Sequence, residues 1–188
     1  DRAYTASPTC TPARVSILTG QYPSVHGAYT IGVSCNLDPQ RTIASWLKKT
    51  GYSTALFGKT HFVARADEAR HLAGTEETPD PDFFHKFTGP YMGFDYIQTC
   101  IGHTTNTKPD MHYRIFLEKL GIDYKQWFPQ LTDTDDQNEV GVWNIPEQYH
   151  DTHWVASKTT EWIRDKSKDD DPWFCWASFQ DPHAPFIC

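Results

Sequence analysis

The pattern of apolar and polar positions predicts helices and strands that alternate along the chain. Residues 42–51 carry apolar side chains at helical spacing, with two lysines in the last turn and a terminal glycine. Residues 52–57 follow as a short apolar strand, and residues 173–179 form a second apolar run, typical of a central parallel strand. A long helix is predicted between them, from Pro146 to about Lys166. This order indicates an α/β fold with a mostly parallel sheet. The residues that share the apolar face of the 42–51 helix are Ile43, Trp46 and Leu47.

Weaker patterns predict the remaining elements. Residues 3–5 are expected to end a strand, residues 93–97 to form a short strand, and residues 111–120 to form a helix. Residues 63–90 are polar, rich in acids and prolines, and show no sustained period. We therefore expect residues 63–145 to form an insert, or substrate-side loops, within a single domain.

Composition narrows the classes of function. The 188 residues carry a net charge of -7, which argues against non-specific nucleic-acid binding. The mean hydropathy is -0.61, and no apolar run reaches the roughly 20 residues that a membrane-spanning helix requires. The five cysteines contain no Cys-x-x-Cys pair, so neither a zinc ribbon nor a dithiol redox motif is predicted. Cysteine usage leaves the redox compartment open.

Residues 7–20 carry the strongest chemical signal. Pro12 fits a first helical turn and Gly20 a helix end, so Cys10 is expected at a helix N-terminus, where backbone N–H groups favour an anion. Arg14 lies one turn further on and adds a forked positive charge suited to sulfate or phosphate. The stretch thus predicts chemistry on an anionic group. Its expected apolar face consists of Val15, Ile17 and Leu18.

The string Cys-x-Pro-x-Arg, followed by Leu-Thr-Gly, resembles the signature of the type I sulfatases. In that family the cysteine is converted after synthesis into formylglycine, whose hydrated aldehyde is the nucleophile. The resemblance implies that Cys10 is the modified residue and that residues 10–14 are read by a formylglycine-generating enzyme. Ala13 is an accepted variant of the more usual serine.

A second stretch, residues 51–61, ends in Gly58-Lys59-Thr60-His61 and resembles the second sulfatase signature. By this resemblance Lys59 contacts both the sulfate and the formylglycine, and His61 hydrogen-bonds a formylglycine oxygen. Taken alone, a lysine after a strand is usually only solvated. Two signatures in the family's order make coincidence improbable.

A third stretch, residues 180–186, resembles the Pro-His-x-Pro-Phe element of sulfatases. The resemblance implies that His183 contacts the sulfate and is a candidate proton donor to the leaving oxygen. A histidine pKa near its ordinary value of about 6.5 suits a proton donor around neutral pH.

The resemblance covers nearly the whole chain and implies an alkaline-phosphatase-like α/β/α sandwich, of which residues 1–188 form a partial catalytic domain. Its first strand and C-terminal part are expected outside these residues. The family binds one divalent cation, usually calcium and otherwise magnesium or manganese, through aspartate pairs that cannot be placed here. Cys10, as formylglycine, is therefore the one residue expected to touch that metal. The expected partners are an organic or saccharide sulfate ester, the maturation enzyme and the remainder of the catalytic domain.

Several alternatives stay open. Related enzymes that share the nucleophile hydrolyse phosphonate or phosphate esters, and a protein of this fold that never matures Cys10 would only bind ligands. Residues 111–166 faintly resemble choline-sulfatases and phosphonate hydrolases. Two weak candidates for metal binding are the acidic loop at residues 133–139 and the pair His150 and His153. The pair is weak because no third ligand is in evidence. His26 is expected to be a hydrogen-bonding loop residue. The family favours a periplasmic or secreted location, with a cytoplasmic one open.

Overall fold

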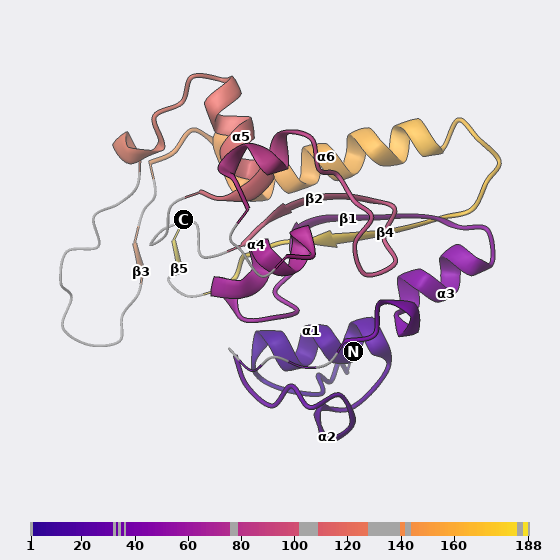
Figure 1. Ribbon diagram of the computed structural model, residues 1–188. Helices are drawn as coiled ribbons and strands as arrows, with labels where there is room; N and C mark the ends of the chain where they lie inside the picture. The colour runs from indigo at the N-terminus through magenta and orange to yellow at the C-terminus, as the bar shows by residue number, and fades with distance from the viewer. Residues whose placement is uncertain are drawn as a thin grey trace. The chain divides into compact units, whose positions relative to one another are not determined.

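Helices and strands alternate along the chain in the computed structural model (Figure 1), which describes residues 2–31, 33, 35, 37–75, 79–101, 109–127, 140–141, 144–183 and 186–187. Strands β1 (Ser53–Lys59), β2 (Tyr96–Cys100) and β4 (Trp173–Ser178) form a sheet in the order β2-β1-β4. Two short strands, β3 (Val140–Gly141) and β5 (Phe186–Ile187), pair in parallel. The α-helices are α1 (Cys10–Thr19), α2 (Pro23–His26), α3 (Ile43–Lys49), α4 (Arg65–Ala73), α5 (Met111–Lys119) and α6 (Asp151–Lys166).

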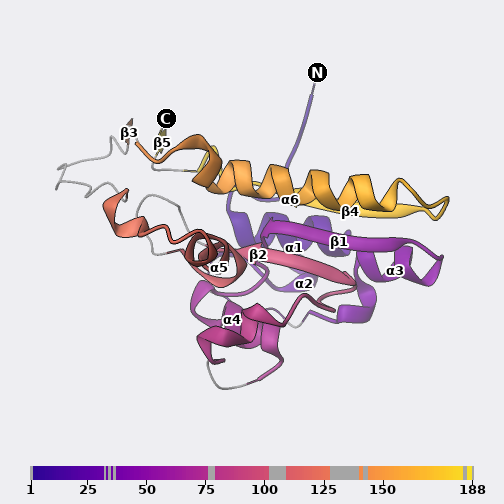
Figure 2. The ribbon, with the colours of Figure 1, turned by 90° about the horizontal axis from the view of Figure 1, so that it is seen from above.

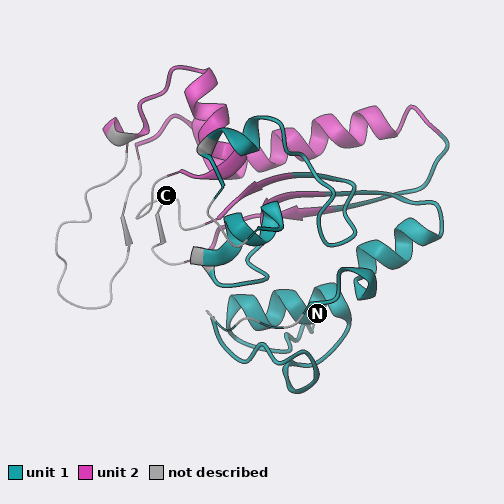
Figure 3. Cartoon of the chain, viewed as in Figure 1, with its two compact units in different colours: residues 1–55, 60–97, 170–175 teal, residues 56–59, 98–169, 176–188 magenta. Residues whose placement is uncertain are grey.

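The chain divides into two compact units (Figure 3). Unit 1 comprises Asp1–Ala55, Thr60–Ile97 and Asp170–Cys175, and unit 2 comprises Leu56–Lys59, Gln98–Asp169 and Trp176–Cys188. Each strand of the three-stranded sheet begins in unit 1 and ends in unit 2, so the three run in the same direction. The predicted α/β fold with a parallel sheet is confirmed.

In unit 2, α6 packs on the end of β1 (Figure 2). The rings of Phe57 and Trp162 meet edge to face, with their centroids 6.3 Å apart. The predicted helix is confirmed, but its predicted start at Pro146 is wrong. Residues Glu147–Tyr149 form a 3-10 turn, and His150 has an extended backbone, so α6 begins at Asp151.

Helix α5 is fixed in unit 2 by contacts to residues of β2, α6 and the segment before α6. The Tyr113 ring lies 5.4 Å from the Trp154 ring, and its hydroxyl donates a hydrogen bond of 2.6 Å to the carbonyl of Tyr149. The backbone N–H of Thr99, in β2, donates to His112 Nδ1 at 3.0 Å. The helix predicted at residues 111–120 is thus confirmed.

In unit 1, the buried face of α3 differs from the predicted one. Ile43 and Trp46 are 41% and 60% exposed, whereas Ala44 and Ser45 are buried. The reason is a close approach to the turn before β2. Ser45 lies so near the backbone of Gly93 that only small residues fit, and Thr42 Oγ1 donates to the carbonyl of Met92 at 2.8 Å.

Four further sequence predictions need correction. Residues 3–5 are irregular rather than strand. The strand expected at residues 93–97 begins at Tyr96, because residues 91–94 form a turn closed by a Tyr91–Phe94 bridge. Ile17 is 61% exposed, since it lies two residues from Val15 and so points away from the Val15 and Leu18 face. Among the described strands of the sheet, β1 is central and β4 lies at an edge.

Helix α4 forms within residues 63–90, where the hydrophobic pattern predicts no regular element. Its charges follow the helix dipole, with Asp67 and Glu68 in the first turn and Arg70 and His71 in the last. Gly74 ends it in a left-handed conformation. The prediction of an insert at residues 63–145 stays a prediction. Of the described helices, none is both long and apolar enough to traverse a membrane.

Candidate functional site

Cys10 is the first residue of α1, as predicted, and it is half-buried and not in a disulfide. The preceding residue, Thr9, occupies the N-cap position but makes no side-chain cap. Its hydroxyl instead lies 3.0 Å from Ser7 Oγ. The start of this ten-residue helix therefore keeps backbone donors that no N-cap side chain satisfies, an arrangement that suits an anion.

Arg14 lies one turn after Cys10 in the same helix and is half-buried. The far end of α1 is held by His26, the last residue of the short helix α2. His26 Nε2 lies 2.9 Å from Ser16 Oγ, and the backbone N–H of Ala28 donates to His26 Nδ1 at 3.1 Å. His26 therefore makes the hydrogen bonds that the sequence predicts, but it lies in α2 and not in a loop, and its burial lowers its pKa.

Lys59 is the last residue of β1 and is 2% exposed. Its carbonyl accepts a hydrogen bond of 2.6 Å from Ser178 Oγ of β4. The preceding Gly58 has a φ of +90°, and the Ser178 carbonyl and Val155 lie against it. The end of β1 is therefore held between β4 and α6, which restricts the movement of Lys59.

His61 follows β1 in unit 1 and is 6% exposed. Its φ of +50° is a left-handed conformation that side chains seldom adopt, and such conformations concentrate at functional sites. The next residue, Phe62, is fully buried and stacks on Tyr91, with ring centroids 6.2 Å apart. The packing of Phe62 thus anchors the segment that holds His61.

His183 lies in the loop after β4 in unit 2, and its side chain is exposed. Its backbone N–H donates to the carbonyl of Gln180 at 3.2 Å, which closes a turn at the carboxyl end of the strand. Ligands of parallel α/β sheets gather at this edge. The position is compatible with the predicted contact to substrate.

The predicted site residues fall into two groups. Cys10, Arg14 and His61 belong to unit 1, and Lys59 and His183 belong to unit 2 (Figure 3). Cys10 and Arg14 lie in the first half of α1, and Lys59, His61 and His183 lie at the end of a strand or in the segment that follows one, where binding residues are common. The assignment of catalytic and substrate-binding roles to them stays a prediction.

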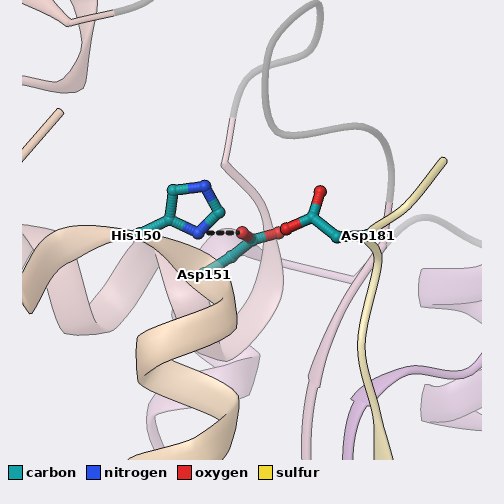
Figure 4. A group of neighbouring side chains, drawn as sticks. All are labelled: His150, Asp151 and Asp181. Carbon is teal, nitrogen blue, oxygen red and sulfur yellow. Dashed lines mark ion pairs between the residues drawn. The ribbon is translucent and has the colours of Figure 1, made fainter. Parts of the chain in front are cut away.

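The structure brings together a cluster that the sequence did not predict. His150, Asp151 and Asp181 each offer one ligand atom, and these atoms lie within 4.8 Å of one another (Figure 4). Burial lowers the pKa of His150, but the hydrogen bond with Asp151 and the charges of Asp151 and Asp181 raise it, and the net shift is upward.

The signal for this cluster is partly present in the sequence. Helical spacing pairs His150 with His153 on one surface, but His153 Nδ1 instead lies 3.9 Å from Glu147. The missing partner, Asp181, comes from the loop after β4, a contact that helical spacing cannot reveal. The acidic loop at residues 133–139 lies outside the described residues.

The described residues do not by themselves form a site for the divalent cation of the resembled family at Cys10. Calcium takes six to eight oxygen ligands. The described residues contain a group of three side chains that could bind a metal ion. This group does not include Cys10. The part of the chain that the structure describes therefore does not itself make a calcium site at Cys10.

A cavity of ≈ 950 Å³ lies within unit 1, lined by α3, α4 and residues around Tyr91. The positively charged side chains that line this cavity include those of Lys48 and Arg70. These two side chains pair with Asp95 and Asp67, so much of their charge is offset. None of the predicted site residues lines this cavity.

Comparison with known proteins gives one family for the whole chain. The family model described as Sulfatase matches residues 1–188. An arylsulfatase of Clostridium perfringens is 31% identical over 191 residues, which cover 98% of this chain and 36% of that protein. A choline-sulfatase of Rhizobium meliloti is 28% identical over 186 residues, which cover 98% of this chain and 31% of that protein. The chain thus spans about a third of the length of these curated relatives.

Solved structures give the same fold. The phosphonate monoester hydrolase SpPMH from Silicibacter pomeroyi matches with a TM-score of 0.62 and 23% identity, over 98% of this chain and 34% of that one. The phosphonate monoester hydrolase of Agrobacterium radiobacter matches with a TM-score of 0.58 and 22% identity, over 97% of this chain and 33% of that one. These matches support the alkaline-phosphatase-like fold expected from the sequence.

Proposed function

Because the chain belongs to the sulfatase family, whose model matches residues 1–188, we propose that the protein hydrolyses organic sulfate esters with a nucleophile made from Cys10. Carbohydrate sulfates are the substrate class that we favour. The remaining ligands of the family's divalent cation and a second lysine are proposed to lie outside residues 1–188.

The start of α1 is the observation that carries this proposal. Cys10 occupies the first helical position, and no N-cap side chain covers the backbone donors beside it. Arg14 follows one turn later on the same helix. Backbone donors, a helix dipole and a guanidinium together attract a sulfate group to the residue that attacks it.

The chemistry requires more than a thiol at this position. Once Cys10 is converted to formylglycine, the hydrated aldehyde supplies one oxygen to attack sulfur and a second to expel the sulfate afterwards. The bond between sulfur and the ester oxygen breaks in the first stage, and the alcohol leaves. The half-buried position of Cys10 is compatible with access by a maturation enzyme.

Lys59 and His61 are proposed to hold the charges that develop. Lys59 is buried at the end of a strand, and a cationic side chain in such a place is suited to a sulfate oxygen. Its backbone is fixed by Ser178, which limits the reorganisation that binding would need. His61 is proposed to hydrogen-bond an oxygen of the modified Cys10.

His183 is proposed to protonate the leaving oxygen. It is exposed in a loop at the carboxyl end of β4, where an imidazole can meet the alcohol portion of a substrate. Protonation by a positioned side chain typically accelerates such a step by about 10²–10⁴-fold.

Turnover of paired esters tests this function. The full-length protein, produced with a maturation enzyme, is expected to hydrolyse an aryl sulfate faster than the matching aryl phosphonate, and Cys10→Ala is expected to abolish both reactions. Preference for the phosphonate would favour the second candidate, which the phosphonate hydrolases of similar fold suggest. No turnover of either ester by matured protein would favour a binding protein.

A further inference from the structure

The cluster formed by His150, Asp151 and Asp181 joins two parts of unit 2. His150 and Asp151 lie at the start of α6, and Asp181 lies in the loop after β4 (Figure 4). The carboxylates of the two aspartates face each other, and the imidazole of His150 lies beside Asp151. Asp151 is completely buried, whereas Asp181 is exposed. One side of the group is therefore open to solvent.

Hydrogen bonds at the start of α6 hold two acceptor atoms of the cluster close together. The backbone N–H of Thr152 donates to both His150 Nδ1, at 3.1 Å, and Asp151 Oδ1, at 2.8 Å. These two acceptors are only 3.0 Å apart. Lone pairs at this separation repel unless a proton or a metal ion lies between them; without a metal ion, the hydrogen bond between His150 and Asp151 supplies the proton.

An independent observation comes from Gln180, the neighbour of Asp181. Gln180 is 8% exposed, and its amide nitrogen donates to Cys100 Sγ at 3.3 Å. Its carbonyl Oε1 accepts no hydrogen bond from the described part of the chain. Burial raises the pKa of the Cys100 thiol, and the charge of Asp151 raises it further, so Asp151 and Gln180 act on the same thiol. The residue next to Asp181 in the sequence thus carries a buried carbonyl oxygen that has no hydrogen-bond partner in the described part of the chain.

We propose that His150, Asp151 and Asp181 bind a divalent transition-metal ion, with Gln180 Oε1 available as a further ligand or as an acceptor for a metal-bound water. One imidazole with two carboxylates is a donor set for zinc or manganese, whereas calcium prefers oxygen ligands throughout. The ion would tie the start of α6 to the loop that carries His183. The cluster does not include Cys10, and its binding of metal does not depend on the proposed sulfatase activity.

Zinc titration of the full-length protein tests the proposal. Isothermal calorimetry is performed after saturation with calcium, so that the family's own site is filled. Wild-type protein is expected to bind one zinc ion per chain, and His150→Asn and Asp181→Asn are expected to weaken binding by about tenfold or more. Asparagine can still cap α6 at position 150, although it loses the contact between the imidazole and Asp151, and position 181 is exposed.

His153→Asn is the matched control, because His153 lies on the same helix and near Glu147 but outside the cluster. Its zinc affinity is expected to equal that of wild type. A zinc-dependent rise in melting temperature should appear in wild type and His153→Asn and be lost in the two cluster variants. Absence of zinc binding in wild type, or equal affinity in all four proteins, would overturn the proposal.

Discussion

The backbone carbonyl of Ser178 lies against the Cα of Gly58 so closely that no side-chain carbon fits between β1 and β4. Val155 Cγ2 of α6 also lies close, 2.9 Å from the position that a Cβ at Gly58 would take. The residue immediately after Gly58 is the buried Lys59. The glycine of the second sulfatase signature therefore sets how closely a strand and a helix approach the predicted sulfate-binding lysine.

Gly58→Ala is expected to destabilise the protein by about 3 kcal/mol or more, because backbone strain and overpacking add. Gly51→Ala is the matched control, since Gly51 has a φ of +91° but no atom within 4 Å of the position that a Cβ would take. Its cost is expected to be about 1 kcal/mol, from strain alone. Urea unfolding of the full-length variants measures both. Equal costs would show that the close approach is unimportant.

His26 is expected to make stability fall at acidic pH. Because Nδ1 accepts from the Ala28 N–H, Nε2 carries the proton and donates to Ser16 Oγ, so the folded state favours the neutral ring. Burial lowers the folded-state pKa of His26, so its stabilisation is complete above about pH 6.5 and is lost as the pH falls through the lowered value.

His26→Asn retains an acceptor for Ala28 but cannot titrate. The free energy of unfolding of wild type should therefore fall more steeply than that of His26→Asn between about pH 7 and pH 5. Denaturant unfolding at several pH values measures the two slopes. Parallel slopes would contradict the role assigned to the neutral imidazole.

Arg14→Lys is expected to lower kcat/KM for an aryl sulfate by about 100-fold, although the charge is conserved. The guanidinium can bind two oxygens at once from its place on α1, and an ammonium cannot reproduce that fork. Lysine is an equally good helix former, so the melting temperature should change little. Activity within about twofold of wild type would place Arg14 outside the site.

His183→Gln is expected to slow hydrolysis most for esters with poor leaving groups, because these need the proton most. An aryl sulfate with an acidic phenol should lose little activity, and an alkyl or sugar sulfate should lose about 10²-fold or more. Comparison of kcat across a series of leaving groups measures this. A uniform loss across the series would indicate a binding role for His183 in place of proton transfer.

Local sequence signals are sufficient to predict the elements that carry the candidate chemistry. Cys10 at the start of α1 and Gly20 at its end follow from turn and cap rules that involve neighbouring residues. The strand predicted at residues 52–57 extends to Lys59, which the sequence analysis places after the strand. The same rules, applied to charge, could have found α4, because its acidic first turn, basic last turn and Gly74 are all visible in the sequence.

Features made by distant residues could not be predicted from the pattern. Ser45 replaces Trp46 on the buried face of α3 because Gly93, far along the chain, approaches it closely. Asp181 joins His150 and Asp151 because β4 ends near the start of α6. Hydrophobic periodicity describes one element at a time and contains no information on such contacts.

Mass spectrometry of the peptide that contains Cys10, from full-length protein made in its native host, tests the central claim most directly. Conversion to formylglycine predicts a mass lower by about 18 Da than that of the cysteine peptide, because an aldehyde replaces the thiol. An unmodified thiol at Cys10, in protein from a host with a working maturation system, would contradict the proposed nucleophile.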